Sequence, residues 1–75
     1  MTHENYKIIR NVMNDCYNTF YAKWAKKALS EPLTDNDWIT ILAEIKTIEQ
    51  KYKNTIAASL AKNLLIDLAE ILENT

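Results

Sequence analysis

The chain contains no glycine and a single proline, Pro32, among its 75 residues. Glycine most often supplies the positive φ angles of tight hairpin turns, bulges and phosphate-binding loops. A chain without glycine therefore has little means of forming a multi-turn β protein, a P-loop or a dinucleotide-binding turn. These absences predict an all-α protein, in which helices are joined by short breaks.

Cysteine and histidine are equally scarce, since each occurs once, as Cys16 and His3. One cysteine excludes an internal disulfide framework and is typical of a reducing compartment, so we expect a cytoplasmic protein. Cys16 lies on an apolar helix face, and no second histidine is present to activate it as a nucleophile. We therefore expect no catalytic residue, no metal and no cofactor, and predict that the protein is not an enzyme.

Long apolar runs and a strong charge bias are also missing. The longest strongly apolar stretches span only a few residues, as at 64–66, so we expect no membrane span. The net charge of −1 gives no general indication of a nucleic-acid or membrane partner. With 48% apolar and 25% charged residues, the composition is typical of a globular protein, and the length predicts one helical domain over residues 1–75.

Apolar residues recur every three or four positions in the first third of the chain, which is the helical period. This pattern predicts a helix over about residues 4–29, with one apolar face formed by Ile9, Met13, Cys16, Phe20 and Trp24. Pro32 then breaks the helix because proline cannot continue it. Thr34 is a good N-cap, and Asp35 and Asp37 place negative charge at the positive end of the next helix. A second helix is therefore predicted over about residues 35–53.

The last third of the chain predicts another helix over about residues 56–73. Its apolar stripe points in a different direction from that of residues 35–53, which favours a break at Asn54 and Thr55. Asparagine tolerates the left-handed conformation that ends many helices, and threonine can cap the next one. One bent helix over both segments remains the alternative. The predicted architecture is an up-down-up three-helix bundle.

Several apolar residues are left over once the bundle core is assigned. Ile39 and Ile66 lie off the buried stripes of their helices, and Tyr17 and Tyr21 lie at the edge of the first stripe. Tyrosine at the edge of a core is common, but it is also enriched in protein interfaces. We predict that these four residues bind a partner, which is either another protein or a second copy of the chain.

A cluster of cations offers an alternative function in nucleic-acid binding. Lys23, Lys26 and Lys27 lie near the end of the first helix, and Arg10 lies upstream. Several cations on one face could contact phosphates. Four are few, however, and lysines near a helix C-terminus are expected from the helix dipole alone. We therefore favour protein binding, with a homodimeric structural module as a further alternative.

Two aromatic segments carry a resemblance to known proteins. Residues 17–24 (YNTFYAKW) and 33–38 (LTDNDW) resemble a pattern in small uncharacterised prophage and mobile-element helical proteins of AT-rich Gram-positive bacteria. The resemblance implies an accessory role in a bacteriophage or mobile element, as an inhibitor or regulator that binds a host protein such as a defence-system component. It implies no catalytic residues.

Overall fold

The computed structural model describes residues 2–74, and every regular element in that range is helical. Three consecutive elements, α1 (His3–Met13), η1 (Asn14–Tyr21) and α2 (Ala22–Ser30), follow one another without a loop and form one long N-terminal helix. They are followed by α3 (Asp35–Tyr52) and α4 (Ala58–Glu73). The prediction of an all-α protein with three helices is confirmed.

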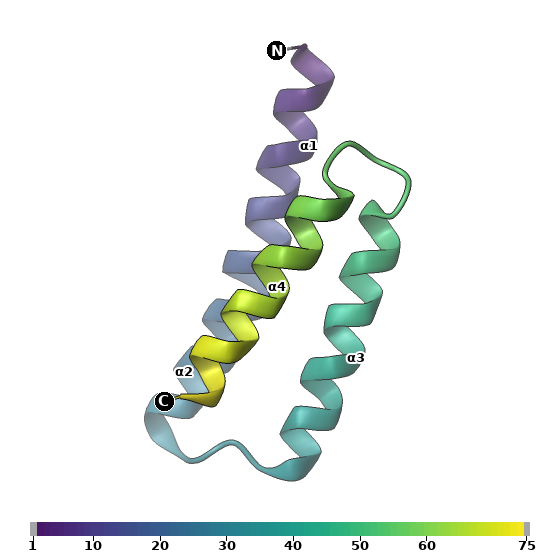
Figure 1. Ribbon diagram of the computed structural model, residues 1–75. Coiled ribbons are helices and arrows are strands. Elements are labelled where there is room, and N and C mark those ends of the chain that lie inside the picture. The colour runs from purple at the N-terminus through teal and green to yellow at the C-terminus, as the bar shows by residue number, and fades with distance from the viewer. Residues whose placement is uncertain (1, 75) are drawn as a thin grey trace.

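The three helices lie side by side in an elongated molecule of 42 × 18 × 15 Å. Figure 1 shows α3 and α4 beside the N-terminal helix, with α1 extending beyond both of them. The C-terminal end of α4 lies close to the end of α2, because Leu72 and Ala28 line the same surface hollow. Figure 1 shows that the N-terminal helix and α4 both run toward this end of the molecule. None of the helices among residues 2–74 is long and apolar enough to cross a membrane.

The core is formed by one cluster of buried side chains that draws on all three helices. Its members are Val12, Cys16, Phe20, Trp24, Ile41, Ile45, Tyr52, Ala57, Ala61, Leu65 and Leu72. The three largest fully buried side chains come one from each helix: Phe20 from the N-terminal helix, Ile41 from α3 and Leu65 from α4. Burial of such apolar surface is the main favourable term in folding.

The middle of the N-terminal helix is a π-helix, η1, in which backbone hydrogen bonds span five residues instead of four. At its end, for example, the Ala22 N–H donates to the Tyr17 carbonyl. A π-helix has more residues per turn than an α-helix, so the buried positions follow one another at intervals of four: Val12, Cys16, Phe20 and Trp24. The prediction that Met13 belongs to the buried face is wrong. Its side chain is 44% exposed, because the 100° step of an α-helix does not hold through η1.

The break between α2 and α3 follows the sequence closely. α2 ends at Ser30, and Pro32 lies in the connecting segment. Thr34 is the N-cap of α3, as predicted, and its hydroxyl accepts from the Asp37 N–H at 3.1 Å. The Asp37 carboxylate in turn accepts from the Thr34 N–H at 2.9 Å. This reciprocal capping box satisfies two backbone donors that the first turn would otherwise leave unpaired.

A second break separates α3 from α4, so the alternative of one bent helix is excluded. Thr55 holds this break: its hydroxyl donates to the Tyr52 carbonyl at 2.8 Å and accepts from the Ala57 N–H at 3.1 Å. The predicted left-handed conformation at Asn54 does not occur, since no residue from 2 to 74 has a positive φ angle. The threonine side chain takes over the role that a left-handed residue plays at other helix ends.

Candidate protein-binding surface

Because positions four residues apart face the same way through η1, we group such side chains of the N-terminal helix into columns that run along its axis. Asp15, Lys23 and Lys27 belong to one column, and each forms an ion pair with a residue of α3. Tyr17 belongs to the opposite column and lies against Leu64 and Leu68 of α4. One column therefore attaches the helix to α3, and the other lies along the groove between the N-terminal helix and α4.

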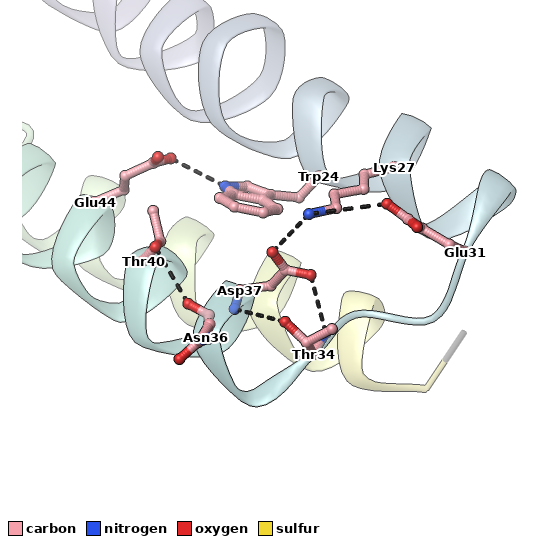
Figure 2. A network of polar contacts seen from close by, with 8 residues as sticks. All are labelled: Trp24, Lys27, Glu31, Thr34, Asn36, Asp37, Thr40 and Glu44. Atoms are coloured by element: carbon pink, nitrogen blue, oxygen red, sulfur yellow. Dashed lines mark hydrogen bonds and ion pairs between the residues drawn. The ribbon is translucent and has the colours of Figure 1, made fainter.

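Trp24 is at the centre of the polar contacts with α3. Its indole Nε1 donates to Glu44 Oε1 at 3.0 Å, and Lys23 Nζ donates to Oε2 of the same carboxylate at 2.6 Å. Lys23 Nζ also lies 4.9 Å from the centroid of the indole ring, a cation–π distance. Figure 2 shows the neighbouring contact, in which Lys27 Nζ donates to Asp37 Oδ1 at 2.6 Å. These contacts fix the N-terminal helix to α3 at Asp37 and Glu44.

The charge of Asp37 is well supported by its surroundings. The hydrogen bond from Lys27, followed by that from the Thr34 backbone, lowers the pKa of the Asp37 carboxyl below its ordinary value. The same hydrogen bond raises the pKa of Lys27. Both groups are therefore ionised at neutral pH, and the carboxylate serves at once as part of the helix cap and as an ion-pair partner.

Asp15 makes a second link to α3, at the other end of that helix. Its Oδ2 accepts from Lys51 Nζ at 2.8 Å and from the hydroxyl of buried Tyr52 at 2.5 Å. Burial acts to raise the pKa of the Asp15 carboxyl, but the hydrogen bonds from Lys51 and Tyr52 outweigh it and hold the pKa below its ordinary value. Burial and the bond to Asp15 raise the pKa of Tyr52. We expect a structural role for this cluster, because each of its polar groups already has a partner.

Cys16 is completely buried beside this cluster. Burial, with a smaller effect of the Asp15 charge, raises the pKa of its thiol to about 11. The thiolate is the nucleophilic form of cysteine, so at neutral pH this side chain is a small apolar core residue.

We expect the Cys16 thiol to react with a maleimide at least about 100-fold more slowly in the native protein than in denaturant, because reaction requires the core to open. The rate is followed by mass spectrometry at pH 7. Asn18→Cys in a Cys16→Ala background is the matched control: Asn18 is exposed in the same segment, and its replacement should react at the unfolded rate. Fast labelling of native Cys16 would contradict the buried position.

An apolar groove of about 400 Å³ runs between the N-terminal helix and α4. Its lining consists of Arg10, Met13, Asn14, Tyr17, Asn18, Leu64 and Leu68. The Tyr21 ring stacks on that of Tyr17, with ring centroids 5.9 Å apart. In α4, Leu60 precedes Leu64 by four residues and Ile71 follows it by seven. The helical repeat therefore places both on the same side of α4 as Leu64.

We call this surface the Tyr17 face. It is composed of Met13, Tyr17, Tyr21, Leu60, Leu64, Leu68 and Ile71. Its outer side chains are well exposed: Tyr17 is 56% accessible and Ile71 49%. Scattered exposed apolar residues are ordinary, but a contiguous set with tyrosines and a groove is typical of a binding surface.

The structure brings together two of the four predicted partner-binding residues. Tyr17 and Tyr21 are neighbours on the Tyr17 face, whereas Ile39 is exposed on α3, which contributes nothing to the groove lining. Ile66 follows Leu64 by two residues and is therefore rotated by about 200° around α4, away from the groove. Ile39 and Ile66 do not share a surface with the tyrosines.

The sequence pattern predicted that Met13 belongs to the buried face, and it did not single out Leu60, Leu64, Leu68 or Ile71 as partner-binding residues. In α4, Leu60, Leu64 and Ile71 each precede or follow a buried residue, and the apolar arc of this helix is wider than one core contact requires. The width of this apolar arc was the signal in the sequence that could have indicated a second apolar surface on α4. Met13 gave none, because its exposure depends on the π-helical geometry of η1.

The four candidate cations do not form a common patch. Arg10 lines the groove, and Lys26 is exposed 16 residues further along the N-terminal helix. Lys23 and Lys27 are engaged by Glu44 and Asp37 of α3. Half of the predicted phosphate-binding set is thus paired with carboxylates, which disfavours the nucleic-acid alternative.

Nothing in the described part of the chain resembles a metal centre, since residues 2–74 contain no group of three His, Cys, Asp or Glu side chains that could hold an ion. Comparison with known proteins gave no match to a family model, a curated protein or a solved structure.

Proposed function

We propose that this protein is a non-enzymatic helical module that acts by binding another protein chain through the Tyr17 face. The observation that carries the proposal is the apolar groove between the N-terminal helix and α4, which is lined by exposed Met13 and Tyr17 and by partly buried Leu64 and Leu68. Tyr17 and Tyr21 supply large, rigid contact area at low cost in side-chain entropy, as aromatic anchors of interfaces do.

The polar surroundings of the groove support the same function. Asn14 and Asn18 border it on the N-terminal helix and hydrogen-bond to each other at 2.9 Å, so their amides are held at the edge of the apolar surface. An apolar centre with a polar rim is the usual composition of a protein interface. Phosphate binding would require cations in these positions.

The resemblance of residues 17–24 and 33–38 to prophage and mobile-element proteins suggests the biological setting. We propose a cytoplasmic inhibitor or regulator of a bacteriophage or mobile element, with an up-down-up bundle that presents the Tyr17 face to a protein such as a component of host defence. The buried, protonated Cys16 thiol fits a reducing compartment.

The test is a quantitative pull-down with the tagged protein from a lysate of an AT-rich Gram-positive bacterium, treated with nuclease and washed at high salt. We expect retention of a discrete protein that falls by roughly 30-fold in Tyr17→Asp, because interface hot spots contribute about 2 kcal/mol or more. Ile39→Asp, which places the same charge at an exposed site outside the Tyr17 face, should retain it. Equal retention by the two variants, or recovery only of nuclease-sensitive material, would refute the proposal.

A further inference from the structure

We infer that the Tyr17 face is an interface between two copies of this chain, related by a two-fold axis that passes near Met13 and Leu64. The inference rests on the proposed function, because it concerns the same surface; a second copy bound there would compete with a different protein for the Tyr17 face. The inference is carried by the distribution of charge along the groove and by the size of the face.

The centre of the face is able to pack against itself. A two-fold axis brings each surface element near the axis into contact with its own copy, so a charge at that position would repel itself. We place the axis at Met13 and Leu64, which both line the groove, and the lining residues that follow Met13 on the N-terminal helix, Asn14 and Asn18, are uncharged. Self-contact at this position is therefore apolar and free of repulsion.

The charges of the face lie off its centre and have opposite signs. Arg10 lines the groove three residues before Met13. Asp67 follows Leu64 by three residues and precedes Ile71 by four, so the helical repeat places it on the same side of α4. Within residues 2–74, neither side chain forms an ion pair.

The direction of the helices makes these two charges complementary in a dimer. The N-terminal helix and α4 run in the same direction, so Arg10 lies toward one end of the groove and Asp67 toward the other, with Leu64 between their levels. A two-fold axis through that level exchanges the ends. It would place each Arg10 next to the partner's Asp67, and the contact would occur twice.

The area of the face is adequate for a small specific interface. The 16 residues of α4 extend about 24 Å, and two neighbouring helices are about 20 Å wide, which gives a flat footprint of about 480 Å². The relief of the side chains adds to this area, and the smallest specific interfaces bury about 600 Å² per partner. An interface of about 600 Å² per partner is close to a ninth of the 5360 Å² surface of one chain.

The test measures mass by light scattering and sedimentation from about 1 µM to about 1 mM of the untagged protein. We expect the mass of a dimer for the wild-type chain. Arg10→Asp and Asp67→Arg should each raise the dissociation constant of the homodimer by roughly 10- to 100-fold, because each creates two like-charge contacts. Helical circular dichroism should not change, since both side chains are exposed.

Mixing the two variants is the decisive experiment. A heterodimer of Arg10→Asp with Asp67→Arg has opposite charges at both contacts, so an equimolar mixture should regain the dimer mass that each variant alone has lost. Lys46→Asp, an exposed charge reversal on α3 outside the Tyr17 face, is the control and should remain as dimeric as the wild-type chain.

The outcomes separate this inference from the proposed function. A wild-type chain that stays monomeric throughout the concentration range overturns the dimer, while Tyr17-dependent capture of a different protein would leave the proposed function standing. A dimer that survives Tyr17→Asp and both charge reversals would mean that another surface joins the copies. Failure of the mixture to regain the dimer mass overturns the two-fold arrangement.

Discussion

Replacing Phe20 by alanine is expected to lower the free energy of unfolding by about 3–5 kcal/mol. Phe20 is completely buried in η1, where it belongs to the core cluster that joins all three helices. A helical domain of this length has a total stability on the order of 4–11 kcal/mol, so the loss is a large part of what is available. The measurement is urea unfolding followed by circular dichroism.

Two further variants make the Phe20 result specific. Phe20→Leu retains most of the volume and should cost less than about 1.5 kcal/mol. Tyr6→Ala removes an exposed aromatic ring from α1, outside both the core and the Tyr17 face, and should change stability by about 0.5 kcal/mol or less. Similar losses for Phe20→Ala and Tyr6→Ala would contradict the position of the core in the middle of the N-terminal helix.

The second large effect is expected from Asp15→Ala, at about 1–3 kcal/mol. The substitution removes the acceptor of the Tyr52 hydroxyl, which then remains buried without this partner, and it also frees Lys51. In a Tyr52→Phe background the same substitution should cost less, because no hydroxyl is left unpaired. The double-mutant cycle measures this coupling by urea unfolding, and strictly additive losses would show that Asp15 and Tyr52 do not interact.

The stability contributed by Asp15 depends on pH in a defined direction. The pKa of its carboxyl is lower in the folded protein than its ordinary value of 3.8. Its contribution is therefore fully present above about pH 4, where the unfolded chain is also ionised, and is lost as the pH falls through the folded pKa. Asp15→Asn should flatten the fall in stability below pH 4. Part of the fall in stability below pH 4 should remain, because the pKa of the Asp37 carboxyl is also lowered.

The sequence predicted the helix boundaries well because the signals that set them are local. Pro32 and the Thr34 cap placed the start of α3 at Asp35, and the change in direction of the apolar stripes correctly separated α3 from α4. The long N-terminal helix was predicted over 4–29 and observed over 3–30. Pro32 and the Thr34 cap act within a few positions of the boundary that they set, and the apolar stripes are read within the two helices that they separate.

The parts that the sequence could not predict depend on geometry or on distant contacts. Nothing in residues 14–21 indicates a π-helix. Because of its wider turn, Val12 is buried in the core and Met13, which was predicted there, is exposed. The bond between Asp15 and Tyr52 joins positions 37 apart in the chain. The Tyr17 face combines side chains from the N-terminal helix and α4, so it becomes visible only when those helices are placed together.

Both tryptophans lie at the same end of the molecule: Trp24 contacts Glu44 through its indole, and Trp38 lines the hollow beside the segment that joins α2 to α3. Intrinsic tryptophan emission therefore reports on that end of a 42 Å structure. Far-ultraviolet circular dichroism, by contrast, averages over every helix and includes the projecting α1. Fraying of α1 on heating would thus lower the ellipticity before the emission changes. The melting curves from ellipticity and from tryptophan emission would then not coincide. A single cooperative core with a frayed α1 is enough to explain this difference, without a populated folding intermediate.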